Sequence, residues 1–284
     1  MAIFTNQATL RYNGGSTNSN IAYGEILEVL EATKTAVEGA YTPGGVMTYV
    51  VTLRNTGTTP LAGLTVTDDL GGFPFGTGTL YPLSYVAGSV ALFSNGAPQP
   101  APAVTAGPPL VISGLTVPAG GDLVLVYQAQ VTEYANPADG STIVNTVTVT
   151  GDGLSAPVTA TETVNAGQGA NLAITKSISP AQVVDNDRVT YTFVIQNAGN
   201  SPVVATDNAA ITDTFDPILT ALAVTFEGTP WTLGTQYTYN ETTGLFETTP
   251  GQITVPAATY TQDPVTGAYT VNPGVVTLTV TGTI

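Results

Sequence analysis

The chain has 284 residues and a formal net charge of −15 at pH 7, because twenty acidic residues outnumber five lysines and arginines. This charge argues against nucleic acid and against an anionic membrane surface as partners, since both attract cationic proteins. Neither cysteine nor histidine occurs, so disulfides, thiolate chemistry and the commonest catalytic base are excluded, and we expect no metal, no cofactor and no enzyme acting on an external substrate.

The first segment of the chain alternates apolar and polar residues, as a β-strand does. It reads FTNQATLRYNG from Phe4, and one face of the predicted strand carries Phe4, Asn6, Ala8, Leu10 and Tyr12. No later stretch approaches the apolar length of a membrane span, so we expect no membrane insertion.

Further short stretches with the period of a strand follow along the whole chain. They include VMTYVVTLRN, GLTVTDDL, DLVLVYQAQV, STIVNTVTVT, RVTYTFVIQN and GVVTLTVTGTI. Gly, Pro, Asn and Asp separate them, which is typical of turns. Only 9% of the residues are charged, and Thr, Val, Gly and Pro replace the residues that helices favour. The sequence therefore predicts an all-β chain of antiparallel sandwiches.

An internal repeat divides the chain. The 31 residues from Leu30 to Pro60 align without gaps with those from Leu172 to Pro202, an offset of 172 − 30 = 142 residues. VTDDL at Val66 and ITDTF at Ile211 match next, and later segments also correspond. We predict a first domain at 26–166 and a second at 167–284, preceded by an N-terminal strand and linker at 1–25.

The second copy stops before the closing strand of the first. The first copy continues into IVNTVTVTGDG from Ile143, whereas the second copy ends at Ile284. A sandwich without its last strand has an exposed apolar groove and an unpaired edge. The opening segment aligns with this closing strand when Asn6 is set against Asn145, so we expect it to be a donor strand.

These motifs resemble the bacterial surface repeats called domain of unknown function 11. That family has a Lys in its first strand, a TYT..V.N.G second strand, a VTD.L strand and a closing I.NTATV strand. The matching residues of the two copies are Lys34, Tyr49, Asn55, Gly57, Asp68 and Asn145, then Lys176, Tyr191, Asn197, Gly199 and Asp213. The resemblance implies immunoglobulin-like sandwiches on a protein of the cell envelope, and it implies no enzyme. We expect an extracellular location, at a cell or spore surface.

Polar residues interrupt the apolar face of three predicted strands in the first repeat and of two in the second, for which Asn6 on the N-terminal strand is the expected third residue. Lys34, Asp68 and Asn145 do so in the first repeat, and Lys176 and Asp213 do so in the second. The chain has only two lysines, and both take this position. The two interpretations are an isopeptide bond and a buried Lys–Asp salt bridge beside a hydrogen-bonding Asn.

An isopeptide bond would join Lys34 to Asn145, with Asp68 as the acid that promotes it. Burial favours the neutral, nucleophilic amine of Lys34. A protonated Asp68 can polarise the amide of Asn145 and shuttle protons as ammonia leaves. A buried ion pair gains little over apolar residues, and it would have to occur twice in a lysine-poor chain, which favours the covalent bond.

The second repeat would need its Asn from another molecule. Lys176 and Asp213 would then react with Asn6 of a second subunit, whose N-terminal strand fills the groove. This head-to-tail contact propagates into a homopolymer. We therefore predict a structural subunit of a self-assembling extracellular filament. The alternative is a fragment of a tandem-repeat surface adhesin, which binds a host or matrix ligand and receives its missing strand from a following repeat.

Overall fold

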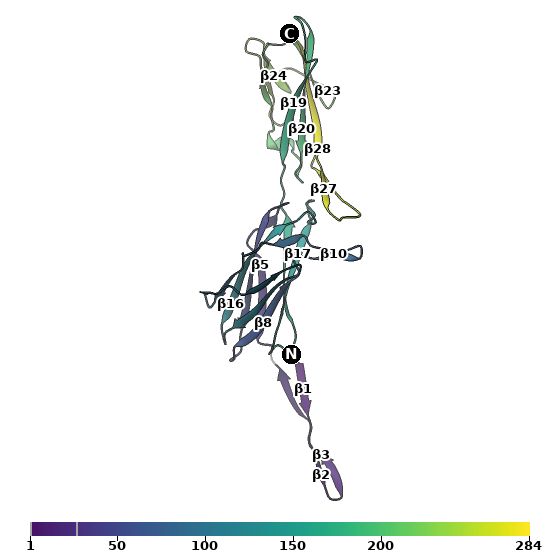
Figure 1. Ribbon diagram of the computed structural model, residues 1–284. Helices are drawn as coiled ribbons and strands as arrows, with labels where there is room; N and C mark the ends of the chain where they lie inside the picture. The colour runs from purple at the N-terminus through teal and green to yellow at the C-terminus, as the bar shows by residue number, and fades with distance from the viewer. Residues whose placement is uncertain (1, 27) are drawn as a thin grey trace. The chain divides into compact units, whose positions relative to one another are not determined.

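The computed structural model describes residues 2–26 and 28–284. Apart from the short 3₁₀ helix η1 (Ala205–Asp207), the regular elements of these residues are all β-strands (Figure 1). The prediction of an all-β fold is confirmed. No helix in the described ranges is long and apolar enough to span a membrane.

The chain divides into two compact units. Unit 1 contains Met1–Ala135 and Thr142–Asn165, and unit 2 contains Asn136–Ser141 and Ala166–Ile284. The loop 136–141 thus groups with unit 2 rather than with the domain predicted at 26–166. Asn200 accounts for part of this grouping, because its amide donates hydrogen bonds to the carbonyl oxygens of Pro137 and Gly167, both at 2.9 Å.

Unit 1 is a sandwich of two large sheets. The first sheet has the order β13-β12-β16-β7-β5, with β11 also pairing with β16. Its strands are β5 (Leu30–Ala36), β7 (Val46–Asn55), β11 (Leu83–Tyr85), β12 (Ala91–Ser94), β13 (Ala97–Gln99) and β16 (Asp122–Val131). On β7 the side chains alternate between buried and more exposed positions, as a strand with one face on a core requires.

The second sheet of unit 1 has the order β14-β15-β8-β17-β18-β6. Its strands are β6 (Ala40–Tyr41), β8 (Leu61–Asp68), β14 (Ala103–Ala106), β15 (Leu110–Val117), β17 (Thr142–Thr150) and β18 (Val158–Ala166). A small hairpin of β9 (Phe73–Phe75) and β10 (Gly78–Leu80) accompanies it. The strand β8 pairs with β15 on one side and with β17 on the other, so neither of its edges is open.

Unit 2 repeats the first sheet of unit 1 closely. Its five-stranded sheet has the order β19-β20-β28-β22-β23. The strands are β19 (Leu172–Ser179), β20 (Arg188–Asn197), β22 (Thr220–Phe226), β23 (Thr229–Trp231) and β28 (Gly274–Thr283). The register repeats as well. Lys34 pairs with Val51, and Lys176 pairs with Phe193, so both members of the pair are shifted by the 142 residues of the sequence repeat.

The second sheet of unit 2 is much smaller than its counterpart. It contains only β21 (Thr212–Thr214), β24 (Tyr237–Asn240) and β25 (Leu245–Thr248), in the order β21-β25-β24. A separate hairpin comprises β26 (Thr259–Gln262) and β27 (Tyr269–Asn272). Among the described residues, unit 2 therefore lacks counterparts of β17, β18 and β6, which is more than the single strand expected from the sequence.

The N-terminal segment is a hairpin rather than the predicted strand and linker. It comprises β1 (Ala2–Asn6), β2 (Thr9–Tyr12), β3 (Gly15–Asn18) and β4 (Ala22–Ile26). β1 pairs with β4, and β2 pairs with β3. The expected single strand is interrupted at residues 7–8, where the register shifts by one residue, and the expected linker supplies the second side of the hairpin.

Candidate functional site

The first site lies in the core of unit 1, where Lys34 on β5 meets Asp68 on β8 of the other sheet. The Nζ atom of Lys34 donates a hydrogen bond of 2.7 Å to Oδ2 of Asp68. Their side chains are 0% and 1% exposed. Two opposite charges so deeply buried cost much desolvation, so their local partners decide whether the pair is tolerated.

Asp68 has two further donors. The Tyr127 hydroxyl, on β16, donates to Oδ2, and the backbone N–H of Leu70 donates to Oδ1 at 2.7 Å. Leu70 adopts a positive φ of 52°, an uncommon conformation for a leucine, in the turn that brings its N–H back to the carboxylate. The carboxylate is thus held in one orientation from three directions.

Asn145, on β17, is completely buried, yet its amide has no hydrogen-bond partner among the described residues. The Tyr49 hydroxyl beside it also lacks a partner. Tyr49 connects the two ends of the site, because the Lys34 ammonium lies 4.8 Å from the centroid of its ring. Leaving a buried amide without hydrogen bonds costs about 1–3 kcal/mol, so such groups are rare in native cores. This amide therefore needs a chemical explanation.

Burial changes the acid–base properties of the groups around this amide. Desolvation lowers the pKa of Lys34, although the carboxylate of Asp68 partly offsets the effect. Desolvation likewise raises the pKa of Tyr49 and that of Tyr127. Burial therefore shifts Lys34 toward its neutral amine, which is the nucleophilic form, and keeps the two tyrosine hydroxyls protonated.

Sequence reasoning missed the role of Tyr127. The alternation on β16 buries Leu123, Leu125 and Tyr127 on one face, so the period of this strand alone could have placed the hydroxyl in the core. The period of the strand could not predict the hydrogen-bond partner of this hydroxyl, because Asp68 lies 59 residues away in the sequence and on another sheet.

The second site reproduces the ion pair in unit 2. Lys176 on β19 donates to Oδ2 of Asp213 on β21. The ammonium lies over three aromatic rings, at 4.6 Å from the centroid of Tyr191, 5.4 Å from Phe193 and 5.2 Å from Phe215.

The surroundings of this pair differ from those of the first site. The side chains of Lys176 and Asp213 are 38% and 19% exposed. The residue paired with Tyr191 is Val280, whereas Tyr127 pairs with the corresponding Tyr49, so unit 2 has no hydroxyl equivalent to that of Tyr127. The second pair is thus open to solvent and has fewer donors.

The exposed pair belongs to a larger open face. All eight residues of β19 are exposed, although the strand is as apolar as β5. Leu172 is 45% exposed, whereas Leu30 at the same repeat position is 5% exposed. We call the exposed side chains of Leu172, Ile174 and Ile178, together with the free edge of β21, the open face of unit 2.

The N-terminal residues predicted to form the donor strand lie together on the hairpin. Phe4, Asn6, Ala8, Leu10 and Tyr12 are all exposed in the single chain. Asn6 pairs with Ala22 of β4. Its meeting with Lys176 concerns two copies of the chain and stays a prediction.

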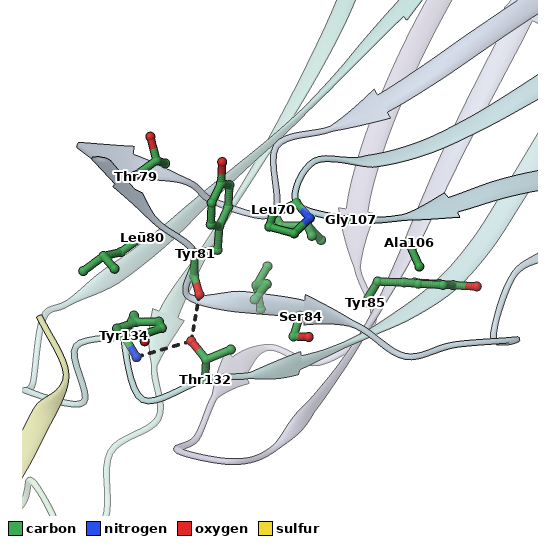
Figure 2. Close-up of a pocket in the computed structure, with 12 residues that line it drawn as sticks. Leu70, Thr79, Leu80, Tyr81, Ser84, Tyr85, Ala106, Gly107, Thr132 and Tyr134 are labelled. Atoms are coloured by element: carbon green, nitrogen blue, oxygen red, sulfur yellow. Dashed lines mark hydrogen bonds between the residues drawn. The ribbon is translucent and has the colours of Figure 1, made fainter. Parts of the chain in front are cut away.

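Unit 1 also has a surface hollow of about 330 Å³, shown in Figure 2. Tyrosine side chains contribute much of its lining, through Tyr81, Tyr85 and Tyr134. The Thr132 hydroxyl donates to the carbonyl oxygen of Tyr81 at 2.8 Å and accepts the N–H of Tyr134 at 3.3 Å, which joins two walls of the hollow. None of the lining residues is charged, so the hollow suits a neutral ligand.

The chain is similar at low identity to several solved structures. The major pilin subunit of Bacillus cereus is 13% identical, with 96% of this chain and 73% of that chain covered and a TM-score of 0.37. The pilus backbone of Streptococcus pneumoniae is 12% identical, with 86% and 55% covered and a TM-score of 0.31. The collagen-binding domain of a Staphylococcus aureus adhesin is 11% identical, with 50% and 99% covered and a TM-score of 0.31.

Similarity at this level assigns no function, which has to come from the geometry of this chain. No family model matches the sequence, and no curated protein matches it. The resemblance to the domain of unknown function 11 therefore stays a prediction.

Proposed function

We propose that the chain is a structural subunit of an extracellular bacterial fibre, which polymerises head to tail by β-strand complementation and is locked by Lys–Asn isopeptide bonds. The observation that carries the proposal is the repeated Lys–Asp pair. It is buried beside an unpartnered Asn in unit 1, and it is partly exposed on the open face of unit 2. Such a fibre would lie outside the cell, on a cell or spore surface.

In unit 1 the proposed reaction joins Lys34 to Asn145. The proton of the Lys34 ammonium passes to Asp68 along their 2.7 Å hydrogen bond. The neutral Nζ then attacks Cγ of Asn145, Asp68 gives its proton to Nδ2 as the bond from Cγ to Nδ2 breaks and ammonia leaves, and the Asp68 carboxylate takes up the second proton that Nζ loses when it becomes an amide nitrogen. One C–N bond forms, one breaks, and no oxidant or cofactor is needed.

The unpartnered amide of Asn145 supports this chemistry over a simple salt bridge. In the salt-bridge interpretation Asn145 would satisfy the remaining donors of the pair, yet both of its side-chain polar atoms lack hydrogen bonds. A covalent bond removes the unpaired amide nitrogen as ammonia. The closed loop would span 145 − 34 = 111 residues and, by analogy with disulfides, would stabilise the fold by about 4 to 5 kcal/mol.

In unit 2 the proposed partner is the N-terminal segment of a second copy. The open face offers an unpaired edge at β21 and exposed apolar side chains on β19, and the N-terminal segment offers exposed apolar side chains on strands. Docking would place Asn6 of one copy beside Lys176 and Asp213 of the next. Donor and acceptor are different surfaces, so each added subunit leaves a new acceptor free.

Electron microscopy and denaturing electrophoresis of the purified chain test the proposal. The intact chain should form fibres that yield ladders after boiling in detergent. Deleting residues 2–15 should abolish the fibres, and Asn6→Ala should abolish the boiling-resistant ladders, whereas Asn20→Ala, also on the hairpin, should leave both unchanged. Monomers from the intact chain under all assembly conditions would contradict the proposal.

The tyrosine-lined hollow of Figure 2 favours a second candidate, an adhesin that binds a neutral ligand in unit 1. In that case the open face of unit 2 would be covered by a following repeat of the same polypeptide. The two candidates differ in one measurement, because the adhesin predicts that this chain stays monomeric while the fibre subunit polymerises.

A further inference from the structure

The N-terminal hairpin and the β17–β18 hairpin of unit 1 have matching architecture. β17 and β18 pair antiparallel, with Asn145 opposite Glu162 and Ile143 opposite Val164. In the N-terminal hairpin, Asn6 lies opposite Ala22 and Phe4 lies opposite Gly24. The segment with Asn6 and the strand with Asn145 are thus each paired with a second antiparallel strand, which in the N-terminal hairpin is the segment predicted to be a linker.

The matching faces differ in what covers them. On β17, Ile143, Asn145, Val147 and Val149 are all buried in the core of unit 1. The corresponding N-terminal residues, Phe4, Asn6, Ala8 and Leu10, are exposed. A two-stranded hairpin is at best marginally stable alone in water, so this exposed face calls for a partner.

The cross-strand pair at the start of the hairpin keeps this face apolar. An added Cβ on Gly24 would lie only 2.3 Å from the ring of Phe4, so the ring covers the glycine. The large residue on β1 thus compensates for the missing side chain on β4, where unit 1 has Ile143 opposite Val164.

In unit 1 the hairpin fills the space between two strands. β17 pairs with β8, and β18 lies between β17 and β6 in the sheet order. In the described part of unit 2, the counterparts of β8 and β6 do not pair with such a hairpin. β21, the counterpart of β8, pairs only with β25 within the described chain. Residues 182–183, at the positions of β6, form no strand, and Val183 is only partly buried, whereas the corresponding Tyr41 is 1% exposed.

We infer that the element donated between subunits is the whole hairpin, residues 2–26 of a second copy, rather than a single strand. β1 and β2 dock along β21, and β4 lies toward residues 182–183. In unit 1, Val147 lies opposite Asp68 and Val149 opposite Val66, so the corresponding register sets Ala8 opposite Asp213 and Leu10 opposite Ile211. This inference rests on the proposed polymer and specifies its contact.

A disulfide across the hairpin tests whether the whole hairpin or only a single strand is donated. Thr5 lies opposite Tyr23, on the face that points away from Phe4 and Asn6. The corresponding position of unit 1, Val144, stays exposed in the assembled sheet, so a bond on this face should not obstruct docking. The chain has no cysteine of its own, so Thr5→Cys with Tyr23→Cys introduces a single possible intramolecular disulfide.

The experiment oxidises this variant in urea, refolds it by dilution and follows polymerisation by sedimentation velocity. The reduced variant and the unmodified chain serve as controls. We expect the locked hairpin to polymerise to at least the extent of the reduced form. If the locked form stays monomeric while the reduced form polymerises, the strands have to separate, and donation of a whole hairpin is wrong.

The other outcomes are equally decisive. If the unmodified chain is also monomeric, the proposed polymer itself fails. If the reduced variant fails while the unmodified chain polymerises, the second pair on the same face, Ile3→Cys with Glu25→Cys, is used. Failure of this variant as well, in its reduced form, means that the outward face takes part in the contact, which overturns the inferred docking geometry.

Discussion

Lys34 and Lys176 occupy the same position of the repeat and bind the equivalent aspartates, yet the side chain of Lys34 is 0% exposed and that of Lys176 is 38% exposed. The difference comes from β17 and β18, which cover the first pair and have no counterpart over the second within the described chain. Because the two lysines are matched in sequence and differ in burial, each serves as the control for the other.

The soluble monomer should be lighter than its calculated mass by one ammonia, because the bond between Lys34 and Asn145 forms within one chain. Asn145→Ala should restore the full mass, whereas Lys176→Ala should not. The free energy of unfolding should fall by about 4 to 5 kcal/mol in Asn145→Ala, because the closed loop is lost. Intact-mass spectrometry decides the matter, and a folded wild-type monomer at its calculated mass would contradict the bond.

Tyr49 and Tyr127 should respond differently to removal of their hydroxyl groups. The two rings stack at 5.8 Å, but only the Tyr127 hydroxyl has a partner, Asp68. In the Asn145→Ala background, Tyr127→Phe should lower the free energy of unfolding by about 1.5 to 3 kcal/mol, the range for a hydrogen bond to a charged group. Tyr49→Phe should be close to neutral. Equal losses in urea denaturation would contradict this assignment.

The stability of a chain without the cross-link should rise with pH in alkaline solution. In Asn145→Ala, burial should keep the pKa of Lys34 below its ordinary value of 10.5, so the unfolded chain binds more protons above the folded pKa. The free energy of unfolding should therefore rise from that pKa toward about 10.

Above about 10 the trend should reverse. The pKa values of Tyr49 and Tyr127 are raised in the folded chain, so the unfolded chain then loses protons that the folded chain keeps. Urea unfolding across this range checks the profile. Adding Lys34→Met and Asp68→Asn to the Asn145→Ala variant should remove the rise of the free energy of unfolding with pH. If the rise persists in this triple variant, groups other than Lys34 cause it.

Replacing Leu30 should destabilise the monomer more than replacing Leu172, because Leu30 is buried and Leu172 is exposed, as is the case for the two lysines. Leu30→Ala should lower the free energy of unfolding of unit 1 by about 2 to 5 kcal/mol, because Leu30 is 5% exposed and its removal leaves a cavity. Leu172→Ala, at a position 45% exposed, should change the stability of the monomer by less than about 1 kcal/mol. It should nevertheless weaken polymerisation, measured by the concentration at which fibres appear. Unchanged assembly would remove Leu172 from the contact.

The local alternation of apolar and polar residues predicted many of the strands. Alternation along VMTYVVTLRN and RVTYTFVIQN predicted strands that coincide with β7 and β20, and the repeat predicted that both would lie in equivalent sheets. The same period placed Lys34 on the apolar face of its strand, where its side chain is buried. These features depend on neighbouring residues along one strand, which a sequence displays directly.

Partners across the sheets depend on how distant strands assemble, and the sequence alone did not reveal them. The Tyr127 hydroxyl meets Asp68 from another sheet, and residues 22–25, which had been expected to form a linker, pair with β1. Strand pairing is decided by edges and faces that exist only in the folded sheet. The sequence by itself therefore determined the strands, the repeat and the inward lysines, whereas only the tertiary structure decided that the N-terminal segment is a hairpin and that unit 2 is open where unit 1 is covered.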